Sequence, residues 1–247
     1  MQYCTFTVNF TTSYTVGAFA GLVKGISTNQ IVDIQSTTVS GLLNSTEAGC
    51  SLLLGDVSGA DVSVSDCSVN VSFSSKQDSS IFVTSCSGSS VNFTDLTLTV
   101  KASVIGGGQF GGAFSSSVLT WQRAHLHIDV SVAGSYSKSG ILAGSYTGQQ
   151  SPHFENSELN GSVYFSDAGS SGIIGYMQDS FGDFNNSNFS IQKLNTNGAT
   201  SKFGFIGESK NNDISFQNCK IGILLNAYNN VGIIGEANGG RFNSYAI

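Results

Sequence analysis

The side chains best suited to chemistry lie in one short stretch of the chain. His125, His127 and Asp129 alternate with apolar residues, so in a β-strand all three project from one polar face. The third histidine, His153, and Arg123 are expected near the same patch. Imidazoles and carboxylates that face a long groove are groups with which enzymes cleave polysaccharides by general acid and base catalysis.

The counterpart of this stretch follows about thirty residues later. We expect Glu158 to stack on His125 and Asn160 on His127. The patch lacks the recurrent carboxylates suited to calcium or to glycoside hydrolysis. We therefore interpret it as a solvated polar face and predict neither a cofactor nor a metal site. The candidate catalytic residues of the alternative, an enzyme, are His125, His127, Asp129 and Glu158.

A motif of a small residue, bulky apolar residues and a closing Gly recurs along the chain. The closing positions are 27 to 34 residues apart. The copies are 17–21, 51–55, 108–112, 141–144, 172–175, 204–207 and 232–235, with 81–85, which closes on Ser85, as a degenerate copy. Repeats of this length predict a stacked architecture in which each unit buries its apolar face against its neighbours.

A second motif precedes each Gly motif, and its first position holds a bulky apolar residue. These first positions form a column through the coils. Its members are Ile34, Val64, Phe93, Trp121, Phe154, Phe184 and Phe216. We predict that Phe93, Trp121, Phe154, Phe184 and Phe216 form a stack in the core, at a spacing of about 4.8 Å. Extended backward, the same frame places Met1 in this column and Cys4 three residues on; extended forward, it places Phe242 there.

The parity of the apolar residues predicts strands joined by a bend. Each column residue is followed, five positions later, by the apolar residue that closes the motif. Because five is an odd number, both side chains can point inward only if the chain bends between them. Asn and Asp tolerate the left-handed backbone of such a bend. The residues expected there are Asp66, Asp95, Asn156, Asn186 and Asn218. Each repeat then has three short strands, of which the Gly motif is the last.

Three short strands per repeat predict an all-β fold, a parallel β-helix of about eight coils of about 30 residues. Sandwiches need tight hairpins, and WD-type propeller blades need periods of about 40 to 45 residues. No segment has the periodicity of an amphipathic helix. We predict one β-solenoid over residues 1–247, without a second domain.

The Gly-apolar-apolar-Gly endings, with an Asn-Ser or Asn-Cys step upstream, resemble the GLUG-type repeats of bacterial adhesins and the Gly-rich repeats of protist surface proteins. The resemblance covers nearly the whole chain, and the fourth to eighth endings match best. It implies the pectin-lyase-like right-handed β-helix and a secreted or cell-surface adhesive stalk.

The cysteines indicate packing rather than ligation. Cys4, Cys67 and Cys219 share one position of the repeat, which suits a packing site because the other coils hold varied residues there. Those residues are Thr37, Leu96, Ala124, Ser157 and Ser187. Cys50 and Cys86 lie near the third strands of neighbouring coils, and the sequence leaves open whether they form a disulfide. Metal-binding Cys-x-x-Cys spacing is absent.

Seven N-glycosylation sequons lie at outward positions or beside inward ones. They start at Asn9, Asn44, Asn70, Asn92, Asn160, Asn185 and Asn188. Their placement permits glycosylation in a secreted eukaryotic protein. A chain this rich in Asn, Ser and Thr contains roughly five by chance, so their use is left open.

Composition predicts an extracellular or cell-surface location. Charged residues make up 11% of the chain, against about 25% in typical soluble domains. The net charge of −6 and the scattered Lys and Arg residues argue against nucleic acid. No apolar run approaches the roughly 20 residues that span a bilayer, so no membrane contact is expected.

Both ends of the chain fall inside a repeat. Natural solenoids end in atypical capping units, so the chain is expected to be an internal fragment of a longer protein. Open strand edges at both ends predict end-to-end association of the isolated chain.

Three function classes remain open. The preferred one is a non-catalytic structural or adhesive module whose polar flank contacts glycans or partner surface proteins. The second is a carbohydrate-active β-helix enzyme, a polysaccharide lyase or hydrolase. The third is an ice-binding solenoid, which the low charge favours but the irregular outward Thr pattern does not.

Overall fold

The computed structural model confirms the predicted solenoid. It describes residues 4–12, 17–25, 31–46, 50–75, 78–105, 108–149, 152–195, 202–226 and 230–245. These residues contain strands and no helix, and they form about seven turns, about 30 residues apart, against the eight coils predicted. All strand pairings join equivalent parts of successive coils in parallel, from β1 with β4 at one end to β21 with β23 at the other.

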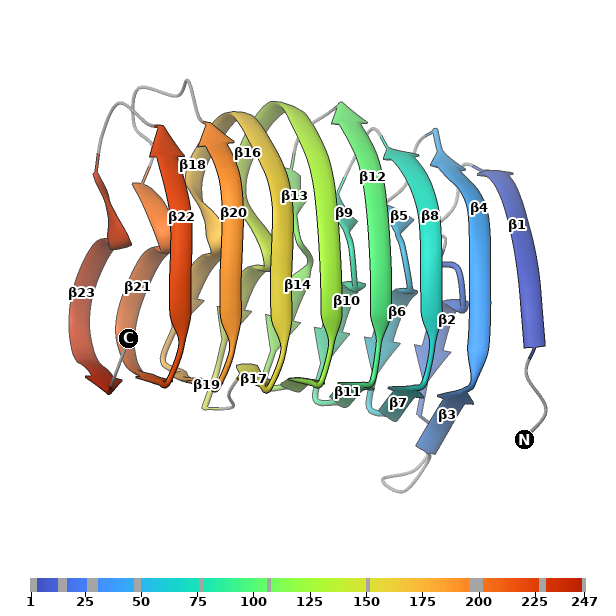
Figure 1. Cartoon of the computed structure of the whole chain (residues 1–247), viewed down its shortest axis with the longest axis horizontal. Coiled ribbons are helices and arrows are strands. Elements are labelled where there is room, and N and C mark those ends of the chain that lie inside the picture. Colours follow the sequence, from blue (N-terminus) through green and yellow to red (C-terminus); the bar gives the residue numbers. More distant parts are fainter. Residues whose placement is uncertain are drawn as a thin grey trace.

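The strands build three faces around one core (Figure 1). The front face contains β1 (Cys4–Thr12), β4 (Thr37–Ser45), β8 (Ser68–Ser75), β12 (Thr97–Ile105), the first parts of β16 (His125–Thr147) and β18 (Glu158–Gln178), β20 (Asn188–Asn195) and β22 (Lys220–Asn226). The lower face contains β3 (Ile31–Gln35), β7 (Asp61–Ser65), β11 (Ser90–Thr94), β15 (Val118–Gln122), β17 (Pro152–Glu155), β19 (Phe181–Asn185) and the ends of β21 (Lys202–Gln217) and β23 (Val231–Tyr245).

The back face carries the Gly motifs. Its strands are β2 (Ala20–Lys24), β5 (Cys50–Ser51), β6 (Leu54–Ser58), β9 (Ser79–Ser80), β10 (Val83–Ser87), β13 (Gly108–Phe110), β14 (Ala113–Ser115), the later parts of β16 and β18, and the first parts of β21 and β23. The chain rises along the front face, descends along the back face and advances one strand per turn, which makes the coil right-handed (Figure 1).

The predicted aromatic stack is present on the inner side of the lower face. Phe93 pairs with Trp121, Trp121 with Phe154, Phe154 with Phe184, and Phe184 with Phe216. All five side chains are fully buried. Ring centroids lie 6.0 Å apart between Phe93 and Trp121 and 5.9 Å apart between Trp121 and Phe154. Phe184 and Phe216 stack at 4.9 Å, whereas Phe189 links the rings of Phe154 and Phe184, at centroid distances of 4.9 and 6.1 Å.

The forward extension of this column was wrong by two residues. Phe242 pairs with Ile214, and Ser244 lies opposite Phe216. Gly204 pairs with Gly232, which is 28 residues later in the chain. The ladder between β21 and β23 keeps this register to the end of the strands. The ring of Phe242 nevertheless lies 5.5 Å from the ring of Phe216, so the predicted aromatic contact is present although the register differs. The backward extension is confirmed, since Cys4 pairs with Thr37; Met1 lies outside the described residues.

The bend between the lower and front faces has the predicted left-handed backbone. Asp66, Asp95, Asn156, Asn186 and Asn218 have φ between 48° and 52°, and Ser36 and Arg123 continue the column at 49° and 52°. Each corner N–H for which a hydrogen bond is found donates to a carbonyl of the next coil, as from Asn186 to Gln217 at 2.8 Å. The corner thus satisfies its backbone groups while it turns the chain.

A second left-handed corner joins the back face to the lower face, and sequence analysis missed it. Its residues are Gly59, Gly88, Ser116, Gly148, Asp179, Asn211 and Gly239, all with positive φ. Four residue types share this column, so no single letter marks it in the sequence. Both corners use residues that reach left-handed backbone at low cost.

Replacing Asn186 with Ala should destabilise the protein by about 1–2 kcal/mol, the usual cost of left-handed backbone in a residue with a Cβ. The side chain is exposed, so little packing is lost. The matched variant Asn186→Gly should cost less, because Gly adopts this backbone freely. Urea unfolding of both variants measures the difference; equal losses would contradict the backbone explanation.

The Gly motif is an irregular part of the back face rather than a regular strand. Consecutive apolar residues such as Ile173 and Ile174 are both fully buried. The ladder also shifts register between Gly140 and Ala143. In the degenerate copy the closing position is Thr84, not Ser85, because Ser85 pairs with Asp56 and Ala113, the residues that follow the closing Gly of the neighbouring coils.

The repeat position shared by Cys4, Cys67 and Cys219, here called the small column, is a packing position from Thr37 to Cys219, whereas Cys4 in the first coil is exposed. Cys67 and Cys219 are buried, and burial raises the pKa of both thiols. In other coils Ser157 Oγ donates to the Glu155 carbonyl at 2.7 Å and accepts from Ala124 N at 2.9 Å. A small polar or thiol side chain therefore fits behind the corner.

The two other cysteines occupy different strands of the back face. Cys50 pairs with Ser79, whereas Cys86 pairs with Val57 and Phe114. Cys86 is a buried free thiol, and the side chain of Cys50 lies outside the described residues.

Candidate binding face

The outward side chains of the front face form polar columns that run along the rod. Because side chains alternate in a strand, Leu126, Ile128 and Val130 point into the core while their neighbours in β16 point outward. The parallel register then places each outward residue beside its equivalents in the coils before and after.

Both predicted stackings are present at the seam between β16 and β18. His125 pairs with Glu158, and His127 pairs with Asn160. His125 Nδ1 lies 3.6 Å from Glu158 Oε2, and His127 Nδ1 lies 2.5 Å from Asn160 Oδ1. An amide oxygen accepts hydrogen bonds, so this contact places a proton on Nδ1 of His127.

Asp129 is the most firmly held carboxylate of the patch. Its Oδ1 accepts from Ser162 Oγ at 2.6 Å and from Ser162 N at 3.2 Å, while its Oδ2 lies 3.5 Å from His127 Nε2. The Ser162 hydrogen bond, aided by the charges of His127 and Lys101, lowers the pKa of Asp129. Asp129 is therefore an ionised acceptor at neutral pH.

His153 does not join this patch, and Arg123 lies at its edge. His153 lies on the lower face, with Nδ1 3.3 Å from Asp183 Oδ2. Arg123 occupies the corner and makes two 2.7 Å hydrogen bonds to Asp95 of the preceding coil. The expectation was wrong for His153, because the left-handed corner at Asn156 separates the lower face from the front face; Arg123 stays near the patch, since its partner Asp95 also interacts electrostatically with His125.

Three hollows lie in a row across the front face. The first has a volume of about 530 Å³ and is lined by residues that include His125, Glu158, Asn188 and Lys220. The second, of about 240 Å³, is lined by His127, Asp129, Asn160, Gly161, Ser162, Ser190 and Gln192. The third, of about 320 Å³, is lined by Ala102, Asp129, Val130, Ser131, Ser162, Val163 and Tyr164.

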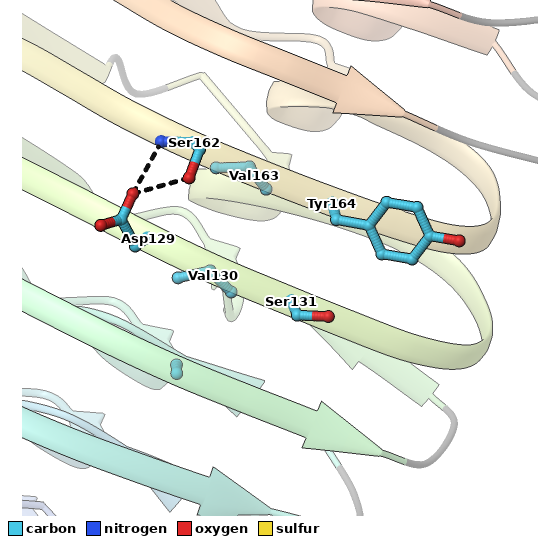
Figure 2. Close-up of a pocket in the computed structure, with 7 residues that line it drawn as sticks. Asp129, Val130, Ser131, Ser162, Val163 and Tyr164 are labelled. Carbon is cyan, nitrogen blue, oxygen red and sulfur yellow. Dashed lines mark hydrogen bonds between the residues drawn. The ribbon is translucent and has the colours of Figure 1, made fainter.

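Figure 2 shows the third hollow, with the hydrogen-bonded Asp129 and Ser162 at one end and Ser131 and Tyr164 at the other. Asp129 and Ser162 also line the second hollow. Sequence analysis singled out neither Ser162 nor Tyr164. Continuing the alternation two and four positions beyond Asn160 would have found both.

The sequon asparagines all lie in strands of the front or lower face. Asn9 and Asn70 are exposed, and the other five are half-buried. Asn160 contacts His127, Asn188 Nδ2 donates to Glu158 at 3.4 Å, and the Oδ1 atom of Asn185 is buried. N-glycosylation stays a prediction at all seven.

Comparisons of the chain with protein-family models, curated proteins and solved structures found no match. The parallel β-solenoid is therefore the level at which the chain is classified. Within the described ranges, no group of three His, Cys, Asp or Glu side chains is arranged to hold a metal ion. The same part of the chain has no helix long and apolar enough to cross a membrane.

The Asp129–Ser162 contact should stabilise the fold in a pH-dependent way. Folding lowers the pKa of Asp129 below its ordinary 3.8, so the contribution is full above that value and is lost as the pH falls through the folded pKa. Ser162→Ala should therefore cost about 1 kcal/mol at pH 7 and less at pH 3, the value being small because the carboxylate is 37% exposed.

Denaturant unfolding at the two pH values checks this expectation. Ser72→Ala, an exposed serine in the same outward column, is the control and should have little effect at either pH. An equal loss for Ser162→Ala at both pH values would contradict the assigned ionisation.

Proposed function

We propose that the chain is a non-catalytic structural or adhesive module of a secreted or cell-surface protein, which contacts glycans or partner proteins through its front face. The observation that carries the proposal is the set of side-chain contacts that join the outward columns from coil to coil. Ser74 donates to Asn44 at 2.9 Å, and equivalent contacts join His127 to Asn160 and Asp129 to Ser162.

These contacts favour binding because side chains that are already ordered lose little entropy when a ligand arrives. Parallel stacking also repeats the polar columns along the rod, which suits a long or multivalent ligand. The resemblance of the Gly-apolar-apolar-Gly endings to GLUG-type repeats supports an adhesive role and a pectin-lyase-like relationship.

The state of Asp129 supports the non-catalytic part of the proposal. A general acid that works near neutral pH needs a raised pKa, as in the carboxylic acids of glycosidases. Asp129 has the opposite shift, and Ser162 occupies one of its oxygens. Assays for reducing ends and for unsaturated products on pectin-like polymers test this part; product formation would overturn it.

Binding of the purified chain to arrays of glycans and of surface proteins tests the rest. The double variant Ser72→Arg and Ser190→Arg places two long side chains on the front face, where both serines are exposed. It should lower binding at least ten-fold. Ser87→Arg and Ser115→Arg, exposed on the back face, form the control and should leave binding unchanged. No binding to either array, or equal losses in both double variants, would overturn the proposal.

A further inference from the structure

The row of three hollows has the length and direction of an extended ligand. Its residues follow β16 from His125 to Ser131 and the neighbouring β18 from Glu158 to Tyr164. Seven residues of strand, with six steps between them, cover about 20 Å. Because the first hollow reaches β22 and the third reaches β12, the row crosses the front face obliquely to the axis of the rod, and it offers contacts to a short chain of several units.

The groups in the second and third hollows are hydroxyls, amides, an imidazole, a carboxylate and a phenol. These groups donate and accept hydrogen bonds at fixed positions, which suits a ligand covered with hydroxyls. The half-buried ring of Tyr164 adds an apolar surface beside them at the end of the row (Figure 2). A pyranose presents both features, hydroxyls around its edge and C–H groups on its face.

The charge of the second and third hollows selects among saccharides, whereas the first hollow is lined by Lys220. Asp129 lines both the second and the third hollow, and the described residues lining these two hollows include no Lys or Arg; Lys101 pairs with Asp129 from β12 but lines neither hollow. The Oδ2 atom of Asp129, 3.5 Å from His127 Nε2, has capacity to accept from a ligand hydroxyl. A uronate or sulfate would instead meet a carboxylate of the same sign, on a chain whose net charge is −6.

We infer that the second and third hollows, on β16, β18 and β20, bind a neutral oligosaccharide, with a pyranose against Tyr164 and a hydroxyl donating to Asp129, and that they reject acidic glycans. This inference rests on the proposed function, because it assigns a ligand class to the front face. A protein partner fits the row less well, since the cores of protein interfaces are depleted in charged groups and rich in aromatic residues.

Calorimetry of the chain with matched tetrasaccharides tests the inference. The neutral probes are cellotetraose, maltotetraose, mannotetraose and chitotetraose, and the acidic probe is tetragalacturonate. At least one neutral probe should bind at least ten-fold more tightly than the acidic one, and this ratio should shrink at 1 M salt, which screens the carboxylates.

Two variants locate the ligand. Tyr164→Ala should weaken binding of the neutral probe about ten-fold, the effect of losing an aromatic contact. Asp129→Asn should reduce the ratio of the affinity for the neutral probe to the affinity for the acidic probe, because it removes the repelling charge and keeps a hydrogen-bond acceptor. Tyr176→Ala on the back face and Asp183→Asn on the lower face are the controls and should leave both affinities unchanged. Unfolding curves verify that each variant is folded.

The outcomes separate the inference from the proposed function. Tighter binding of tetragalacturonate, or neutral binding that neither Tyr164→Ala nor Asp129→Asn changes, would overturn the inference and leave an adhesive module standing. Binding of the chain only to proteins in the arrays, and to no glycan, would likewise overturn the inference and leave the adhesive module standing. Failure to bind any glycan or protein would overturn both.

Discussion

Trp121→Ala should lower the free energy of unfolding by about 3–5 kcal/mol, the range for removing a large aromatic side chain from a core. Trp121 is fully buried, and its ring lies against Phe93, Phe154 and Phe82 at centroid distances of 6.0, 5.9 and 5.2 Å. Its removal leaves a cavity that spans two coil interfaces. Because each coil is stabilised by its neighbours, both should weaken together.

Trp121→Phe is the matched control. Phenylalanine occupies this column in the coils on either side, and the Nε1 atom of Trp121 is buried without a hydrogen-bond partner. Losing that unpaired donor offsets part of the lost packing, so the cost should be within about 1 kcal/mol. Denaturant unfolding followed by circular dichroism measures both variants; similar losses would mean that the stack does not depend on ring volume.

Gly204→Ala should destabilise the solenoid by about 3 kcal/mol or more, at the upper end of overpacking effects. A Cβ at this position would lie 2.3 Å from the carbonyl oxygen of Gly232 and 2.8 Å from that of Ile233. Both atoms belong to the backbone of the next coil, so relief requires the pairing of β21 with β23 to shift. Gly172 has the same relation to Gly204, at 2.2 Å.

Gly222→Ala tests whether this cost arises from the close approach of the coils. A Cβ on Gly222 would have the Phe189 carbonyl oxygen as its nearest neighbour, at 3.7 Å, an ordinary contact. The substitution should leave stability unchanged or raise it by up to about 1 kcal/mol, since Ala restricts the unfolded chain. Thermal and urea unfolding compare the two variants; equal effects would contradict the steric explanation.

Much of the fold could be predicted because a solenoid repeats each requirement in every coil. The column from Phe93 to Phe216, the small column and the bend at Asp66, Asp95, Asn156, Asn186 and Asn218 all lie where the repeat placed them. Where the physical requirement is met by several residue types, prediction failed. The second corner, which mixes Gly, Ser, Asp and Asn, was missed for this reason.

The candidate site was predicted in part. The stacking of Glu158 on His125 and of Asn160 on His127 follows from register, and both contacts are present. The enzymatic and adhesive alternatives, the location and the partners stay predictions. His153 was misplaced because the corner at Asn156 lies between it and Glu158, so the two residues belong to different faces.

Sequence alone determined the period of the coil, the inward and outward assignment of each strand and the residues of the main bend. These follow from local alternation and from backbone preferences that act within a few residues. Only the tertiary structure decided the register of the last coil, the three faces and the hydrogen bonds of Asp129. Those features depend on backbone pairing between coils some thirty residues apart, and that pairing sets which side chains meet.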